Sequence, residues 1–109
     1  MGRCRLKRGD VILIAAGKPR PAVIVQDDRF ETPLDVLICP FTSTLIDAPI
    51  YRLQVNPTPE NGLQVASQVM IDKIGPAART RIGRVIGRLT EDEMARLTQA
   101  VATIIGLAD

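Results

Sequence analysis

The chain has 109 residues, 46% of them hydrophobic and 24% charged, which suits one domain with a buried core and excludes a disordered chain. The net charge is only +2, and an aromatic content of 3% requires a core of Val, Ile, Leu and Ala. No apolar run approaches the roughly 20 residues of a membrane-spanning helix, so we expect a cytoplasmic protein with no membrane partner. We expect a single domain over residues 1–109.

The first third of the chain predicts short strands with no polar face. Residues 10–16 and 22–25 are continuous apolar runs, and a turn with Gly and Pro at 17–21 separates them. This pattern indicates a hairpin or a bent strand pair. Residues 35–39 form a third run, rich in β-branched side chains. Because Pro40 has no backbone N–H to donate, we expect that strand to end or to bulge there.

The second half of the chain continues the pattern of short strands. Further strands are expected at residues 50–55, 67–72 and 81–89. The first of them alternates apolar and polar residues, which indicates a half-exposed strand. Residues 56–62 form the clearest loop, with two Pro, two Asn and a Gly. Gly83 and Gly87 interrupt the last strand and indicate a possible bulge.

The last segment predicts an amphipathic helix with defined ends. Thr90 and Glu93 have the spacing of a capping box, and the acidic first turn suits the helix dipole. Apolar residues then recur on one face at Met94, Leu97, Val101 and Ile104, and Gly106 stops the helix. Short strands followed by one helix, without βαβ alternation, predict a mainly β (α+β) fold. We expect a strongly bent antiparallel sheet or small SH3-like barrel with a C-terminal helix.

Positive charge is concentrated in two stretches of the sequence. They hold Arg3, Arg5, Lys7 and Arg8, and then Lys73, Arg79, Arg81, Arg84 and Arg88. The second stretch contains no acidic residue from position 73 to 90, so it is suited to a polyanion. The alternative is a basic face that contacts only solvent.

The sequence has no His, which excludes Ser-His-Asp triads, Cys-His pairs and imidazole acid–base catalysis. Cys4 lies in the basic start and Cys39 in an apolar strand, so we expect neither a disulfide framework nor a zinc site. There is also no glycine-rich phosphate loop. We therefore expect no metal and no cofactor, and a site built from Arg, Thr, Ser, Asp or Lys.

Arg20 is the most distinctive of these candidates. Pro19 and Pro21 flank it, and each proline keeps the preceding residue out of the helical region, so the turn is stiff. An arginine held in this way is suited to bind a phosphate or its transition state through two hydrogen bonds. The alternative is an Arg at a strand edge that points into solvent.

Hydroxyl side chains follow the third strand at Thr42, Ser43 and Thr44. They are suited to bind phosphate oxygens, or instead to close a turn through their own backbone. Asp72 ends an apolar strand just before the basic stretch. It is a candidate base, or a salt-bridge partner of Lys73 or Arg79.

Several segments, in their order and spacing, resemble the MazF/PemK toxin family. Residues 7–14 followed by 20–25 are similar to the opening strands of that family, where an Arg-Pro pair begins the second strand. Residues 36–43 resemble its next strand, which ends in a Thr. Residues 62–74 resemble a later strand with a Ser-Gln-Val core, and 88–107 resemble the closing helix. Together these segments cover nearly the whole chain.

This resemblance implies a homodimeric toxin of a type II toxin–antitoxin system that cuts single-stranded RNA without a metal. It implies a 2′,3′-cyclic phosphate product, catalytic roles for Arg20 and Thr42, and an antitoxin whose acidic C-terminal tail occupies the RNA groove. Ser43, Asp72 and Lys18 are further candidates for catalysis or RNA contact. The candidate RNA-binding residues are Lys73, Arg79, Arg81 and Arg84.

Two features depart from the family pattern. The loop at residues 15–19 is shorter than in several relatives, where it folds over the RNA, so the RNA sequence that is cut stays open. Residues 28–33 resemble CcdB, which shares the fold but poisons DNA gyrase. A gyrase-binding toxin is therefore one alternative, and an SH3-like binding module without activity is another. The pair of Arg20 and Thr42 favours the RNase, for which the general base stays unassigned.

Overall fold

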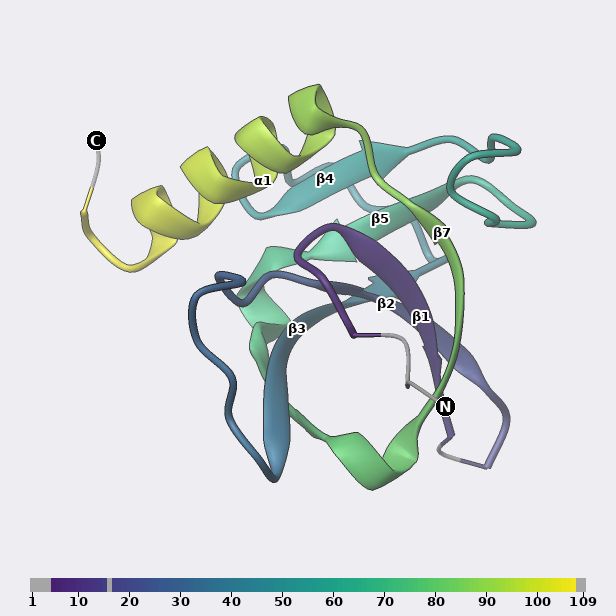
Figure 1. The fold of residues 1–109 in the computed structure, drawn as a ribbon. Coiled ribbons are helices and arrows are strands. Elements are labelled where there is room, and N and C mark those ends of the chain that lie inside the picture. The colour runs from purple at the N-terminus through teal and green to yellow at the C-terminus, as the bar shows by residue number, and fades with distance from the viewer. Residues whose placement is uncertain (1–4, 16, 108–109) are drawn as a thin grey trace.

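Short antiparallel strands and one C-terminal helix make up the computed structural model, which describes residues 5–15 and 17–107 (Figure 1). The strands are β1 (Asp10–Ile14), β2 (Arg20–Ile24), β3 (Asp35–Thr42), β4 (Arg52–Val55), β5 (Ser67–Met70), β6 (Gly75–Ala78) and β7 (Ile82–Arg88). The helices are η1 (Ile71–Lys73), η2 (Arg79–Arg81) and α1 (Glu91–Ile104), the first two being single 3₁₀ turns. The mainly β fold and its closing helix are confirmed. Cys4 and Ala16, about which the sequence made predictions, lie outside the described residues.

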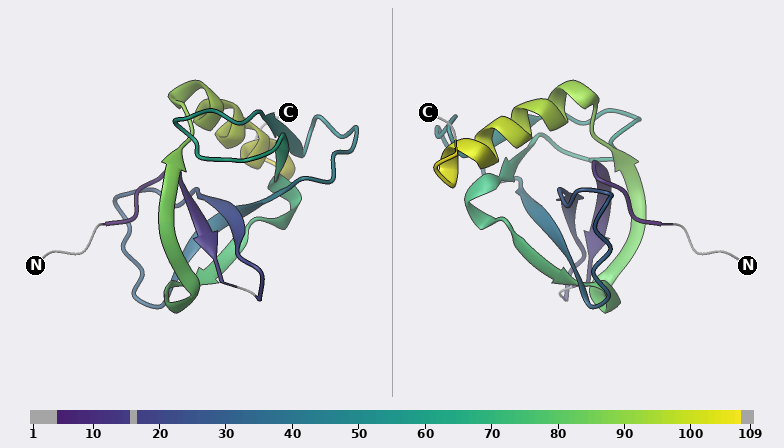
Figure 2. Two further views of the ribbon diagram at one scale, coloured as in Figure 1. Left: turned by 90° about the vertical axis from the view of Figure 1, so that its right-hand side faces the viewer. Right: turned by 60° about the vertical axis from the view of Figure 1, so that its left-hand side comes forward.

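The strands form a bent antiparallel sheet in the order β4-β5-β3-β2-β1-β7. Strand β3 has three partners in this sheet. Strand β2 pairs with one edge of β3, and β6 and β5 pair with successive parts of its other edge. Strands β1, β2, β3 and β7 curve around a common interior, and α1 crosses the end of the molecule next to β4 (Figures 1 and 2). No helix of the described residues is long and apolar enough to span a bilayer.

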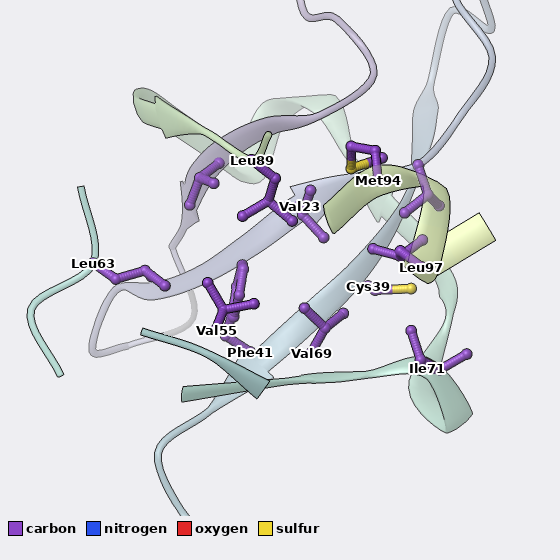
Figure 3. Close-up of a cluster of buried hydrophobic side chains, with 12 residues drawn as sticks. Val23, Cys39, Phe41, Val55, Leu63, Val69, Ile71, Leu89, Met94 and Leu97 are labelled. Atoms are coloured by element: carbon purple, nitrogen blue, oxygen red, sulfur yellow. The ribbon is translucent and has the colours of Figure 1, made fainter. Parts of the chain in front are cut away.

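The curved sheet is buried on both faces, which explains why its strands lack a polar face. Alternate residues enter different clusters: Val11 and Val23 lie in one, and Ile12, Ala22 and Ile24 lie in the other. The first cluster also receives Met94 and Leu97 from α1 (Figure 3). Leu97 is fully buried there, and burial of such a side chain stabilises the fold by about 1.5–3 kcal/mol.

The expected end or bulge of β3 at Pro40 is wrong, because the strand continues to Thr42 and Pro40 pairs with Ala22 in a regular register. On one side β3 pairs with β6 through residues 35–38 and with β5 through Phe41 and Thr42. Pro40 lies between these two paired stretches, so a residue without an N–H interrupts neither ladder.

Other boundaries differ by a few residues, and one strand was missed. The strands expected at 10–16, 50–55 and 67–72 are shorter, and the last of them ends in η1. The missed strand, β6, has the sequence Gly-Pro-Ala-Ala, which has low strand propensity. It forms because it pairs with β3 at the edge of the sheet, where Pro76 is tolerated.

The ends of α1 are as the sequence predicts. Thr90 Oγ1 accepts a hydrogen bond from the backbone N–H of Glu93 at 3.0 Å. The Glu93 carboxylate accepts one from the backbone N–H of Thr90 at 2.9 Å, which completes the capping box. The expected bulge in β7 is also confirmed, since its pairing with β1 shifts register twice between Val11 and Ile14.

Candidate functional site

Arg20 and Thr42 lie at the same end of the sheet. Strands β2 and β3 pair with Ala22 opposite Pro40 and Ile24 opposite Ile38. Arg20, the first residue of β2, and Thr42, the last residue of β3, each lie two residues beyond the last of these pairs. Both residues line a groove of about 770 Å³, which we call the Arg20 groove. Its lining includes Lys18, Arg20, Thr42, Ser43, Gln64 and Arg84.

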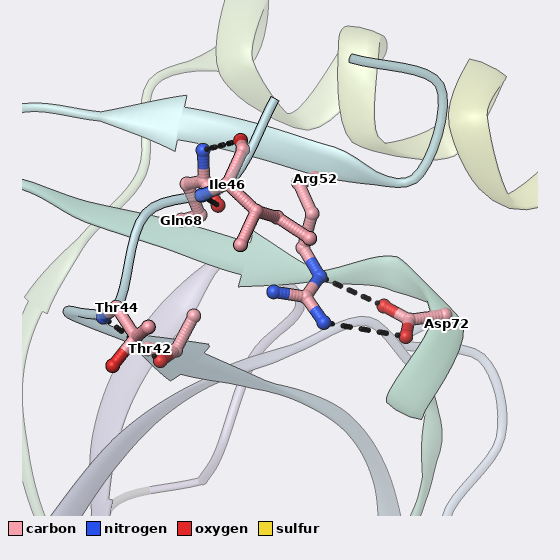
Figure 4. A network of polar contacts seen from close by, with 6 residues as sticks. All are labelled: Thr42, Thr44, Ile46, Arg52, Gln68 and Asp72. Carbon is pink, nitrogen blue, oxygen red and sulfur yellow. Dashed lines mark hydrogen bonds and ion pairs between the residues drawn. The ribbon is translucent and has the colours of Figure 1, made fainter. Parts of the chain in front are cut away.

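The hydroxyl of Thr42 has a defined hydrogen-bonding direction. Its Oγ1 accepts a hydrogen bond from the backbone N–H of Thr44 at 3.1 Å (Figure 4). This contact occupies a lone pair of the oxygen and leaves its O–H free to donate. Ser43, between them, is exposed and also lines the groove. The turn-closing alternative raised by the sequence is therefore present, and it is compatible with donation by Thr42 into the groove.

The cations of the Arg20 groove have no acidic partner, unlike several other Arg residues. Within the described part of the chain, no carboxylate lies within ion-pair distance of Lys18, Arg20 or Arg84. By contrast, Arg88 contacts Asp10 at 2.6 Å, and Arg29, Arg52 and Arg96 also have carboxylate partners. A groove with several cations and no neutralising acid is suited to an anionic ligand.

The opposite wall of the groove is a loop fixed to β7. Buried Asn61 accepts hydrogen bonds at Oδ1 from the N–H groups of Thr58 and Leu63, both at 3.0 Å. The next residue, Gly62, has a φ of +71°, and a Cβ there would lie 2.2 Å from the carbonyl oxygen of Ile86. Loop and strand thus approach too closely for any side chain at this position. Gln64 and Val65 follow from this fixed point and line the groove.

Asp72 forms an ion pair with Arg52 and does not line the Arg20 groove. Arg52 donates through Nε to Asp72 Oδ1 at 3.1 Å and through a second nitrogen to Oδ2 at 3.4 Å (Figure 4). These hydrogen bonds hold the pKa of Asp72 below its usual value, and the charges of Arg52 and Lys73 add to the effect. The partner is thus Arg52 rather than Lys73 or Arg79, and it comes from β4.

The fold places the cations of residues 73–88 in different parts of the molecule. Arg84 lines the Arg20 groove, whereas Lys73, Arg79 and Arg81 do not. Arg79 donates through Nε to the carbonyl oxygen of Thr32 at 2.6 Å. Arg81 is exposed, and its backbone carbonyl accepts from the N–H of Ala15, close to the turn that carries Arg20. Lys73 ends η1, next to the Arg52–Asp72 pair.

Other candidate chemistries find little support among the described residues. Burial raises the pKa of the Cys39 thiol to about 12, with a smaller effect of the Asp72 charge, so the thiolate is absent at neutral pH. No group of three or more His, Cys, Asp or Glu side chains suited to a metal ion occurs over residues 5–15 and 17–107.

Sequence reasoning did not select the wall residues Gln64 and Val65, or the buried residues Ser67 and Gln68 of β5. Their positions follow from long-range contacts, such as the contact of Gly62 with Ile86. One signal was available: a Gln in an apolar strand needs a buried hydrogen-bonding partner. Gln68 has one, in the backbone of Ile46.

Residues 7–105 match the family model described as the PemK-like, MazF-like toxin of type II toxin–antitoxin systems. The chain belongs to this family. This MazF-like toxin is 41% identical over 108 residues to a Mycolicibacterium smegmatis protein named "Probable endoribonuclease MazF". That comparison covers 94% of this chain and 99% of the relative.

Solved structures of MazF toxins share the fold. The Mycobacterium tuberculosis toxin MazF-mt6 superimposes with a TM-score of 0.79 at 23% identity, covering 92% of this chain and 99% of that one. An endoribonuclease from a mycobacterial species, solved in complex with its cognate antitoxin, gives a TM-score of 0.76 at 27% identity. The latter comparison covers 94% of this chain and 97% of the other.

Proposed function

We propose that this toxin is an endoribonuclease that cuts single-stranded RNA in the Arg20 groove, with Arg20 and Thr42 as its catalytic residues. Family membership and the 41% identical relative named as an endoribonuclease support the activity. The observation that carries the choice of residues is that Arg20 and Thr42 line the same groove, whose lining, over the described residues, contains no acidic residue. The gyrase-binding alternative is not favoured, because these relatives are named as endoribonucleases.

The reaction needs no nucleophile from the protein. The 2′-hydroxyl of the RNA attacks the adjacent phosphorus, the bond to the 5′-oxygen of the next nucleotide breaks, and a 2′,3′-cyclic phosphate and a 5′-hydroxyl form. Negative charge builds up on the phosphorane oxygens in the transition state. Arg20 and Thr42 stabilise that charge, Arg20 through two N–H groups and Thr42 through the O–H that its contact with Thr44 leaves free.

Arg20 is unsuited to the role of general base, because the pKa of a guanidinium exceeds about 12. It stabilises charge, or it donates a proton to the leaving 5′-oxygen. Lys18, Ser43 and Arg84 line the same groove and are suited to contact neighbouring phosphates and hydroxyls of the RNA. The general base stays unassigned.

The proposed partners are a second copy of the chain, RNA and an antitoxin. Large apolar side chains are exposed on the segment between β3 and β4, Ile50 at 65% and Leu45 at 48%, and a second protomer would bury such surface. A mycobacterial relative was solved with its cognate antitoxin. An acidic tail of such a partner would gain from the same cations that bind RNA. A toxin that cuts cellular RNA acts in the cytoplasm.

The direct test of the activity is to incubate the purified protein with a long single-stranded RNA in EDTA. We expect cuts at defined sequences, 5′-hydroxyl ends and cyclic phosphate ends, identified by primer extension and phosphatase sensitivity. Intact RNA under conditions in which the protein is folded would contradict the proposal. Inhibition of DNA gyrase by the same preparation would favour the CcdB-like alternative.

Charge at Arg84 tests whether RNA and antitoxin share the groove. In a Thr42→Ala background, which still binds but is slow to cut, Arg84→Glu should weaken RNA binding and reduce the salt slope by about 0.7 log units per lost phosphate contact. It should weaken antitoxin binding in parallel. Arg96→Glu, on the exposed face of α1, is the matched control for net charge. Loss of RNA binding with unchanged antitoxin binding would show that the two surfaces differ.

A further inference from the structure

Gln68 is the one buried Gln in the described part of the chain, and both ends of its side-chain amide are hydrogen-bonded. It lies on β5 with 6% of its surface exposed. Its Nε2 donates to the carbonyl oxygen of Ile46 at 2.8 Å, and its Oε1 accepts from the N–H of Ile46 at 3.2 Å (Figure 4). Both backbone groups of Ile46 are thus paired with one side chain, in the way a neighbouring strand would pair them.

The same residue is also the backbone neighbour of Thr42. Strands β3 and β5 pair with Thr42 opposite Gln68 and Phe41 opposite Val69. The chain leaves β3 at Thr42, turns at Ser43 and Thr44, and returns to the side chain of Gln68 at Ile46. Gln68 therefore holds both ends of the turn at residues 42–46, which carries the hydroxyl groups of the groove.

We propose that Gln68 is a positioning residue of the RNA-cleavage site, which acts by holding the turn at residues 42–46 so that the Thr42 hydroxyl is aimed into the groove. This proposal rests on the assignment of Thr42 as a catalytic residue. Gln68 does not line the groove, so it acts on the reaction through the turn and not by touching RNA.

The physical reason is that the turn has few other fixed contacts. Leu45 and Ile46 are 48% and 42% exposed, so the apolar core holds neither side chain. Within the turn the remaining contact is that of the Thr44 N–H with the Thr42 hydroxyl. Without the Gln68 amide, the N–H and carbonyl of Ile46 hydrogen-bond to water instead. The turn is then less well fixed, and Thr42 Oγ1 adopts several directions. A displacement of about 1 Å at a reacting group can lower a rate by about 100-fold.

The test compares Gln68→Ala with Gln54→Ala. Gln54 is the residue of β4 that pairs with Gln68, but it is exposed and its side chain contacts Asn56. We expect Gln68→Ala to lower kcat by about tenfold to 100-fold with KM near the wild-type value, because the Thr42 hydroxyl acts mainly in the transition state. Gln54→Ala should cleave RNA like the wild type.

A second variant keeps the test valid if Gln68→Ala does not fold. Gln68→Met has nearly the same volume, but its side chain neither donates to the Ile46 carbonyl nor accepts well from the Ile46 N–H. It should also lower kcat more than KM. Urea unfolding gives the folded fraction, to which each kcat is normalised. Normal kcat in either folded variant would overturn the proposal.

A Thr42→Ala background separates positioning from general loss of structure. If Gln68 acts through Thr42, Gln68→Ala should cost little in a protein that already lacks the hydroxyl. A full further loss in that background would overturn the proposal. If Thr42→Ala alone cleaved RNA normally, the failure would lie in the catalytic assignment itself, and Gln68 would have no hydroxyl to position.

Discussion

The Arg20 groove and the Arg52–Asp72 pair both contain arginines near strand ends, yet they differ in whether the positive charge is neutralised. In the groove, Arg20, Lys18 and Arg84 have no carboxylate within ion-pair distance in the described part of the chain. At the other end of β5, Arg52 is bound through two nitrogens to Asp72 and lies over the ring of Tyr51. The cations of the groove are therefore available to an anionic ligand. The Arg52 cation instead forms an ion pair that links β4 to η1.

The contrast shows that a basic stretch in the sequence is not by itself a binding surface. Arg88 belongs to the same stretch as Arg84, but it contacts the buried carboxylate of Asp10. Substitutions in the two regions should therefore affect different properties. In the Arg20 groove they should lower the rate of RNA cleavage, and at the Arg52–Asp72 pair they should lower the stability of the fold.

The largest expected effect is that of Arg20→Ala. We expect cleavage to fall by about 1,000-fold or more, the upper end of the effect of removing one transition-state donor, because a full positive charge is lost as well. Unfolding by urea should be nearly unchanged, since Arg20 is exposed. Arg96→Ala, which removes the same charge from α1, should cleave at the wild-type rate. Near-normal cleavage by a folded Arg20→Ala protein would remove Arg20 from the mechanism.

Thr42→Ala should have the next largest effect. We expect kcat to fall by about 100-fold, as for the loss of one neutral hydrogen-bond donor to the transition state. KM should change little, which single-turnover cleavage of a short RNA at several RNA concentrations would show. If turnover stays normal, Ser43 or Thr44 supplies the hydroxyl, and the same assay on their Ala variants would identify which.

The smallest effect is expected for Asp72→Asn, in the other region. The hydrogen bonds from Arg52 hold the pKa of Asp72 low, so the ionised carboxylate stabilises the fold at neutral pH. That contribution is lost as the pH falls through the lowered pKa. We expect Asp72→Asn to lower the free energy of unfolding by about 0.5–1 kcal/mol at neutral pH. The difference from the wild type should shrink in acid, as measured by urea unfolding at a series of pH values.

Cleavage by Asp72→Asn should equal that of the wild type at neutral pH. A folded variant that does not cut RNA would instead make Asp72 a candidate for the missing general base. The two assays on one variant therefore decide between a structural and a catalytic carboxylate.

Local patterns in the sequence were enough for much of this fold. The apolar runs around Val11 and Val23 predicted strands because both of their faces are buried, and the capping box of Thr90 located α1. Strand β6 was missed because it depends on pairing with β3, which its own residues do not encode. The prediction at Pro40 was wrong because a missing N–H disrupts a strand only where a neighbouring strand would accept from it. Pro40 lies between the stretches of β3 that pair with β6 and with β5.

The candidate site was predictable where its residues carry a local signal in the sequence. The prolines around Arg20 and the hydroxyls after β3 are local signals, and the fold places both in one groove. The partner of Asp72 and the contacts of Gln68 come from residues about 20 positions away, at Arg52 and Ile46, and no local pattern points to them. Side-chain partners of this kind are set by register, which a single sequence does not specify.

In the proposed reaction, Arg20 and Thr42 act as one unit on the same phosphate. The most direct test is the rate of RNA cleavage by the double variant Arg20→Ala/Thr42→Ala, compared with the two single variants and the wild type. If both groups stabilise one transition state, their effects are strongly non-additive, and the double variant should be little slower than Arg20→Ala alone. If the two losses in rate multiply in full, as for two independent groups, Arg20 and Thr42 do not act on the same phosphate as one unit.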